Sequence, residues 1–267
     1  MLNGDPLTLL TLRYVIVALM MAGIAVVTKA PWPKDWKLIS HISVCGLMMQ
    51  VVYFGGCWLA MSMGVGAGVT ALIVCMQPVL TAAVVGPLLG ERVTHFQWIG
   101  LVLGMVGVGL VVAEKLSLGL GTTAGMVWSF VGLLGITAGT IYQKKYCADM
   151  DLRTGGVIQF VVSAIIFFPF ALWLEDGQVN WNTDVILSMG YVAIVSSLIS
   201  ISLLSFMIKR GEASKVASLF FLVPPCALLL SYFLLGEPIS IISFSGMVLA
   251  AIGVVIVLRK KESLKNN

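Results

Sequence analysis

The stretch Ala67–Val112 reads AGVTALIVCMQPVLTAAVVGPLLGERVTHFQWIGLVLGMVGVGLVV, and the chain contains it twice. A shift of 146 positions, which takes Ala67 to Ala213, lays Ala213–Leu258 on it without a gap. Shared Leu and Val mean little in two apolar stretches, but a Pro, a Gly-Glu pair and two more Gly in one register are much less expected by chance. The pattern predicts an internal duplication, the feature to look for first. The most informative pairs are Pro78/Pro224, Gly90/Gly236, Glu91/Glu237, Gly100/Gly246 and Gly107/Gly253.

The composition places the chain in a membrane. It is 59% hydrophobic and 10% charged, with a mean hydropathy of +1.04, whereas a soluble domain has roughly 25% charged residues. A chain of 267 residues cannot hide so much apolar surface from water, so its solvent is a lipid bilayer. The net charge of +4 therefore does not indicate nucleic acid, and no nucleic-acid partner is expected.

Nine apolar runs are long enough to cross roughly 30 Å of hydrocarbon. They are expected to be helices, because open strands leave backbone groups unpaired in lipid. The fold class is thus an all-α polytopic membrane protein with nine predicted transmembrane helices. The runs are Leu7–Val27, Leu38–Met61, Gly66–Leu89, Phe96–Ala113, Gly121–Tyr142, Gly155–Leu174, Val185–Ile208, Ala213–Leu235 and Ile241–Leu258.

Positive charges are distributed unevenly between the loops. If the first run enters the membrane from outside, fourteen of the sixteen Lys and Arg lie on the inner side. The two exceptions are Lys115, on the outer side, and Arg13, inside the first run. Loops rich in Lys and Arg stay in the cytoplasm. The pattern predicts a multi-pass protein of the cell (inner) membrane with a cytoplasmic C-terminus.

The repeat also predicts how the two copies are oriented. The match extends back through the first run, for example at Thr8/Thr154, but the run Gly121–Tyr142 has no partner. Its counterpart would lie before Met1, so a ten-helix protein lacking its first helix is expected, through a late start codon or real loss. Residues 1–115 would then be a five-helix repeat that lacks its first helix, and residues 116–267 would be the complete second repeat. An odd helix number makes the copies run in opposite senses, as in many secondary transporters.

The motif L-L-G-E resembles a known family. It stands at Leu88–Glu91 and Leu234–Glu237, after a Pro-containing helix and before a polar cap and a helix with spaced Gly. This arrangement resembles the EamA-type repeat of the drug/metabolite transporter superfamily, and the resemblance covers the whole chain, twice. It includes Gln159, which the 146-residue shift pairs with Arg13, and adds Gln159 to the candidate pathway. It implies ten helices, cytoplasmic termini, and export or exchange of small metabolites.

The Gly-Glu pairs and the prolines are candidates for elbows and hinges. Gly90 and Gly236 are expected to end their helices in left-handed conformation, followed by a cap at Thr94 or Ser240. A gating or ion-linked role for Glu91 and Glu237 is the alternative. Pro78 and Pro224 are expected inside helices, where proline removes a hydrogen bond and would shape a cavity or hinge; the alternative is packing alone.

Arg13 is the one charge well inside a span. Intramembrane charges mark functional sites by default, although from this depth the side chain can also snorkel outward. An arginine in the pathway would hold a carboxylate through two parallel hydrogen bonds. Other polar or aromatic residues are candidates for the same pathway, with helix-to-helix hydrogen bonding as the alternative for Ser and Thr. They are Gln50, Tyr53, Trp58, Gln77, Trp128, Thr137, Ser196 and Ser200.

The sequence lacks the motifs that are typical of several other activities. The sequence has no G-x-x-x-x-G-K-[ST] loop, no ligand cluster around His41 or His95, and no carboxylate near the centre of a span. We expect no cofactor or metal and no enzymatic activity. The prediction is a secondary transporter that exports small organic metabolites, amino-acid-like or drug-like, by alternating access. A truncated remnant or assembly partner, an intramembrane lipid-modifying enzyme, and a homodimeric state stay open.

Overall fold

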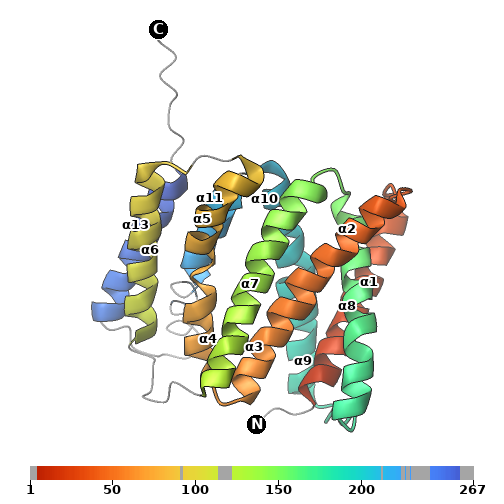
Figure 1. Cartoon of the computed structure of the whole chain (residues 1–267). Helices are drawn as coiled ribbons and strands as arrows, with labels where there is room; N and C mark the ends of the chain where they lie inside the picture. Colours follow the sequence, from red (N-terminus) through yellow and green to blue (C-terminus); the bar gives the residue numbers. More distant parts are fainter. Residues whose placement is uncertain are drawn as a thin grey trace. The chain divides into compact units, whose positions relative to one another are not determined.

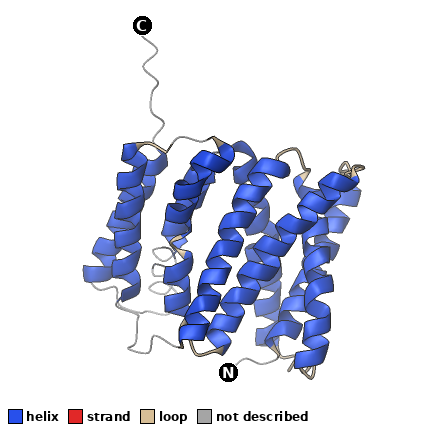
Figure 2. Cartoon of the chain, viewed as in Figure 1, coloured by secondary structure: helices blue, strands red, loops and turns tan. Residues whose placement is uncertain are grey.

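Every element that the structure describes is a helix (Figures 1 and 2). The computed structural model describes residues 5–90, 93–113, 122–211, 213–223, Cys226, Leu229 and 241–258. In chain order the elements are α1 (Pro6–Val27), α2 (Trp36–Gly46), η1 (Leu47–Val52), α3 (Tyr53–Ser62), α4 (Ala67–Val74), α5 (Gln77–Leu89), α6 (His95–Ala113), α7 (Thr123–Tyr146), α8 (Leu152–Leu174), α9 (Thr183–Tyr191), η2 (Val192–Ile199), α10 (Ser200–Arg210), α11 (Ala213–Ser218), η3 (Leu219–Leu222) and α13 (Ile241–Leu258).

The described helices include five that are long and apolar enough to cross a membrane. These are Pro6–Val27, Trp36–Ser62, Thr123–Tyr146, Leu152–Leu174 and Val185–Arg210, with mean hydropathies between 1.6 and 2.3. Shorter apolar helices lie at 77–89, 95–110 and 244–258. An all-α polytopic membrane protein is therefore confirmed. The count of nine spans stays a prediction.

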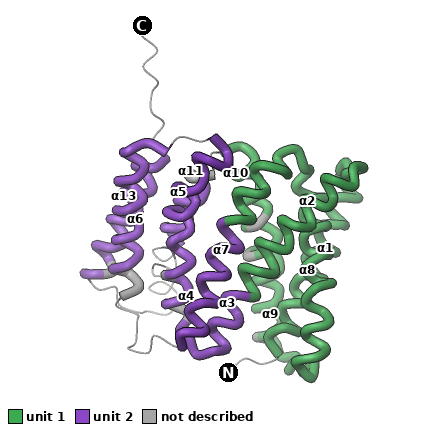
Figure 3. Tube along the Cα trace, viewed as in Figure 1, with its two compact units in different colours: residues 1–55, 138–211 green, residues 56–137, 212–267 purple. Residues whose placement is uncertain are grey.

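The chain packs into two compact units (Figure 3). Unit 1 consists of Met1–Gly55 and Ala138–Gly211, and unit 2 consists of Gly56–Thr137 and Glu212–Asn267. Each unit therefore takes segments from both predicted repeats, 1–115 and 116–267. The repeats are defined by sequence and the units by packing, so the repeat boundaries remain a prediction.

In unit 1, α1 and α8 pack side by side along their length. The Tyr14 ring lies 6.0 Å from that of Phe160 and 5.8 Å from that of Phe167, between centroids. At one end of the pair, Leu7 N and Thr8 N donate to the Glu175 carboxylate over 2.8 and 2.7 Å. Because the start of α1 meets the end of α8, the two helices are antiparallel.

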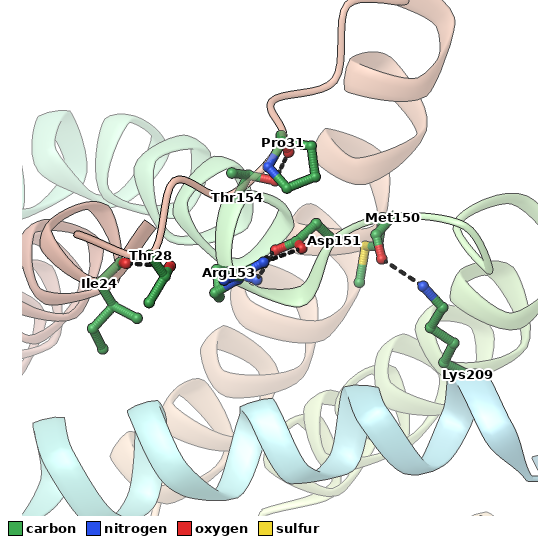
Figure 4. Close-up of polar contacts among 8 residues, drawn as sticks. All are labelled: Ile24, Thr28, Pro31, Met150, Asp151, Arg153, Thr154 and Lys209. Atoms are coloured by element: carbon green, nitrogen blue, oxygen red, sulfur yellow. Dashed lines mark hydrogen bonds and ion pairs between the residues drawn. The ribbon is translucent and has the colours of Figure 1, made fainter. Parts of the chain in front are cut away.

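The opposite end of this pair is closed in a similar way. Thr154 Oγ1 near the start of α8 donates to Pro31 O, beyond the end of α1, over 3.0 Å (Figure 4). Asp151 caps α8 by accepting from Arg153 N at 2.9 Å, and it also pairs with Arg153 Nη2 at 2.7 Å. Hydrogen bonding from Arg153 holds the pKa of Asp151 below its usual range, because it stabilises the charged carboxylate.

In unit 2, α6 and α13 pack through glycines. A Cβ at Gly100 would lie 2.7 Å from Gly253 O, and a Cβ at Gly107 would lie 2.6 Å from Gly246 O. Residues later in α6 contact residues earlier in α13, so this pair of helices is also antiparallel. Small residues allow such close backbone approach between membrane helices. Around the contact lies an apolar core that includes Leu101, Val108, Phe221, Ala250, Val254 and Val257.

Within the described residues, several predicted spans contain interruptions. The spans over 36–62 and 183–210 each contain a π-helical segment, η1 and η2. Shifting η1 by 146 positions gives 193–198, which falls within η2. The predicted span Gly66–Leu89 is divided at Cys75 and Met76 into α4 and α5.

The prediction that Pro78 lies inside a continuous helix is therefore wrong. It lies in the first turn of α5. Proline is favoured there because its missing N–H would have no helical acceptor at that position and its φ suits a helix. The proline inside α5 is Pro87 instead.

Candidate functional site

Arg13 is buried within unit 1. Its side chain is only 6% exposed, so it does not snorkel to a membrane surface. Its Nε donates to Ser197 Oγ in η2 over 2.6 Å, and its guanidinium carbon lies 4.6 Å from the centroid of the Phe54 ring. The hydroxyl and the aromatic face together hold the guanidinium in one orientation, with the ring supplying a cation–π contact.

The next residue of α1 reaches the other π-helical segment. Tyr14 is fully buried, and its hydroxyl donates to Gln50 O in η1 over 2.9 Å. Ser197, the partner of Arg13, donates to Val192 O over 2.9 Å, five residues earlier in η2. Consecutive residues of α1 thus bind η1 and η2. Single π turns inside α-helices are frequently found at functional sites.

Three buried side chains in this part of unit 1 have polar atoms without a hydrogen-bond partner among the described residues. They are Arg13 at Nη2, Gln50 at both amide atoms, and Gln159 at Nε2. Gln50 and Gln159 are 0% and 1% exposed. A buried polar group that lacks a partner costs about 1–3 kcal/mol, and such groups call for an explanation. Hydrogen bonds link Arg13 to Ser197 and its neighbour Tyr14 to Gln50, and we name these four residues the Arg13 cluster. Gln159 lies beside Gly46, about two helical turns along the same span from the Phe54 that Arg13 contacts.

The elements that carry this cluster and Gln159 contact one another. α1 packs on α8 and on η2, and α8 packs on η1. Gly46, just before η1, allows the approach of α8, since a Cβ there would lie 2.8 Å from Gln159 Cα. The sequence predicted Arg13, Gln50 and Gln159 for the pathway but missed Tyr14 and Ser197. Ser197 stood among several Ser in one helix, and only the π-helical geometry of η2 distinguishes it.

Of the other predicted pathway residues of unit 1, Tyr53 lies close to Arg13 and Tyr14, whereas Ser200 is exposed. Tyr53 is half-buried, with its ring 4.7 Å from that of Phe54. Ser200 is exposed, and its hydroxyl donates to Val195 O over 2.8 Å within its own helical segment. The side chain of Ser196 lies outside what the structure describes.

Four predicted pathway residues belong to unit 2. Gln77 is fully buried in α5, and Trp58 is half-buried in α3. Trp128 is 36% exposed on α7. Thr137 Oγ1 donates to Leu133 O over 2.7 Å, so its hydroxyl bonds within α7. The structure thus divides the predicted pathway between two units, and the Arg13 cluster is the part that it brings together.

One of the two predicted elbows lies within the described residues. Gly90 ends α5 with φ 71°, and its N–H donates to Gly86 O over 2.9 Å. Thr94 and Gln97 then cap α6 reciprocally: Thr94 N donates to Gln97 Oε1 over 2.8 Å, and Gln97 N donates to Thr94 Oγ1 over 3.3 Å. Glu91, Pro224, Gly236 and Glu237 lie outside the described residues.

A pocket of about 360 Å³ lies in unit 1, lined by residues 31–33, by α2, by the start of α8 and by the end of α10. Its charged lining consists of Asp149, Asp151 and Lys209. Lys209 Nζ donates to Met150 O over 3.1 Å, and Asp151 pairs with Arg153. Two of its three charges are therefore already engaged within unit 1. The Arg13 cluster, which has unpartnered donors, is the better candidate site.

A buried cation within an apolar helix marks a functional site in a membrane protein. Comparison with known proteins identifies the class of protein. The chain belongs to the EamA-like transporter family, whose model matches residues 1–113 and 123–259. It is thus a membrane transporter of the drug/metabolite superfamily and not an enzyme.

Similar proteins are named as transporters or efflux pumps. An uncharacterized transporter, YvbV of Bacillus subtilis (strain 168), is 24% identical over 98% of this chain and 85% of its own length. A probable amino-acid metabolite efflux pump of Escherichia coli (strain K12) is 26% identical over 95% and 86%. The uncharacterized inner membrane transporter YedA of the same strain is 21% identical over 96% and 82%. A solved structure at 14% identity shares the fold, with a TM-score of 0.81 over 95% of this chain and 88% of that one.

Proposed function

We propose that this chain is a secondary transporter that exports small organic metabolites across the inner membrane by alternating access. The observation that carries this proposal is the Arg13 cluster: a buried cation and a buried amide, both with unpartnered atoms, at two π-helical segments. Such a cluster is costly in a protein that binds nothing there. A solute that forms the missing hydrogen bonds explains it.

The packing supports an inverted repeat behind this mechanism. Tyr14 and Phe160 are equivalent positions under the 146-residue shift, and they contact each other. The 146-residue shift takes Gly100 to Gly246 and Gly107 to Gly253. In unit 2, Gly100 contacts Gly253, and Gly107 contacts Gly246. This exchange of equivalent positions between antiparallel helices is the pattern of a twofold axis. Inverted repeats of this kind underlie alternating access in many transporters.

The direction and class of solute follow from charge and from relatives. The Lys-rich and Arg-rich loops support a cytoplasmic C-terminus, and the E. coli and Salmonella typhimurium relatives are named as probable amino-acid metabolite efflux pumps. We therefore infer an amino-acid-like solute taken from the cytoplasm. The bilayer is the second partner. A homodimer stays a prediction.

Solute counterflow in proteoliposomes tests the proposal. The purified full chain is reconstituted, and the vesicles are preloaded with unlabelled amino acids or with cationic amines. Uptake of the labelled solute above that of protein-free vesicles is expected for at least one amino acid. Vesicles that match the protein-free control for every solute would contradict transport and favour the remnant or assembly-partner alternative.

A further inference from the structure

We propose that the Arg13 cluster selects solutes that carry a carboxylate, with Arg13 as the residue that binds it. This inference rests on the proposed function, because it assigns the chemical class of solute to the same site. It begins from a charge without a partner inside the membrane-spanning part of unit 1.

No acidic residue can neutralise Arg13 from within the long spans. Asp and Glu do not occur in Pro6–Val27, Trp36–Ser62, Thr123–Tyr146, Leu152–Leu174 or Val185–Arg210. The ion pair found among the described residues joins Arg153 to Asp151 at the start of α8, and it does not involve Arg13. Arginine stays protonated in proteins, and a buried charge is costly unless it is paired. The counter-ion that these five spans lack is supplied by the solute.

The geometry leaves one side of the guanidinium for this purpose. Nε is bonded to Ser197, and the ring of Phe54 lies against the guanidinium at 4.6 Å. Nη2 is buried and has no partner among the described residues. Because Arg13 donors lie in the guanidinium plane, an anion that meets Nη2 approaches from the edge, which is how carboxylates bind arginine.

Gln50 adds to this chemistry. Its Nε2 is a further unpartnered donor, and its Oε1 is an unpartnered acceptor. A carboxylate has lone pairs for several donors, and the ammonium group of an amino acid can donate to an amide oxygen. A cation without a carboxylate would instead meet Arg13 as a like charge. The cluster therefore fits an α-amino acid better than a cationic drug.

The experiment compares amino acids with their amides, which keep the side chain and the amine but lose the carboxylate. L-leucine, L-phenylalanine and L-threonine are each measured beside the corresponding amide, by counterflow in proteoliposomes and by equilibrium binding to the full chain in detergent. A hydrogen bond to a charged group contributes enough for about a 10- to 100-fold preference for the acid. Arg13→Gln is expected to reduce this preference to near unity.

Two further variants separate charge from geometry and from folding. Arg13→Lys keeps the charge but loses the planar donor edge, and an intermediate preference is expected. Arg210→Gln is the matched control, because Arg210 also lies over an aromatic ring, Phe206, at 4.5 Å but is exposed. It should keep the wild-type preference. If Arg13→Gln fails to elute as a folded species, Arg13→Lys decides.

The outcomes distinguish the two proposals. Transport with equal preference for acid and amide, or a preference unchanged in the folded Arg13 variants, overturns the carboxylate assignment and leaves the transporter standing. Absence of counterflow with acid-selective, Arg13-dependent binding supports the site and contradicts the transporter. Absence of both counterflow and binding overturns both.

Discussion

At the residue scale, one carboxylate from a distant part of the chain caps the first helix. The N-cap residue of α1, Asp5, makes no side-chain hydrogen bond to the helix. Glu175 instead accepts from Leu7 N, Thr8 N and Thr8 Oγ1 over 2.7–2.9 Å. The first turn of a helix has donors without helical acceptors, and negative charge there is favourable. Glu175 therefore joins the start of α1 to the end of α8.

Replacing Glu175 should destabilise the folded chain. Loss of an N-cap typically costs about 0.5–2 kcal/mol, and we expect a loss in that range for Glu175→Ala. Glu175→Gln keeps one acceptor oxygen and should lose less. The measurement is unfolding of the purified protein in a denaturing detergent series, followed by loss of helical circular dichroism.

Asp176→Asn provides the control for this series. Asp176 is the adjacent acidic residue and is exposed, so its replacement changes the same net charge without removing a cap. Its stability should equal that of the wild type. Equal stabilities of Glu175→Ala and Asp176→Asn would contradict the capping role.

At the scale of elements, the structure has two kinds of helix contact: close backbone packing between α6 and α13, and locally widened π-helical turns in η1 and η2. The α6–α13 pair depends on glycines that bring two backbones together. The spans that contain η1 and η2 instead widen locally, and there they receive hydrogen bonds from Tyr14 and Arg13 of α1. A widened turn changes which residues share a face, so helical periodicity alone does not place Gln50 or Ser197.

The glycine contact gives a matched pair of substitutions in one helix. Gly107→Ala would place a methyl group 2.6 Å from Gly246 O, whereas nothing lies within 4 Å of a Cβ at Gly109. Both substitutions raise helix propensity by about 1 kcal/mol. Gly107→Ala should nevertheless destabilise the protein, because overpacking costs about 1–3 kcal/mol and the obstructing atoms are backbone.

Thermal stability of the two variants, measured by fluorescence-detected size-exclusion chromatography after heating, checks this prediction. Gly107→Ala should lose its folded peak at a lower temperature than the wild type, and Gly109→Ala at the same or a higher one. A reversed order would mean that the α6–α13 contact does not limit stability.

At the scale of the whole molecule, packing units and sequence repeats divide the chain differently. Unit 1 pairs α1 with α8, and unit 2 pairs α6 with α13. Each of these pairs joins a helix to its own equivalent under the 146-residue shift. A duplicated chain that exchanges helices in this way cannot separate into its two repeats. The contact units therefore cross the predicted boundary between residues 115 and 116.

The orientation of the whole chain can be tested with reporters. The positive-inside pattern predicts that a green fluorescent protein fused after Leu258 will fluoresce and that alkaline phosphatase there will be inactive. Phosphatase fused after Gly177, in the acidic segment between α8 and α9, should be active. The opposite pattern at both positions would contradict a cytoplasmic C-terminus.

The sequence by itself determined the solvent, the helical class and the family resemblance. It also singled out Arg13, because a charge within an apolar run is visible in composition alone. Only the tertiary structure decided what Arg13 contacts: Ser197 lies 184 positions away, and its position depends on a π-helical segment. The structure also assigns Gln77 and Trp128 to unit 2 and Arg13 to unit 1. The sequence shows that a charged residue lies within an apolar helix, where burial is costly. Which side chains contact that residue depends on packing between segments that are far apart in the sequence.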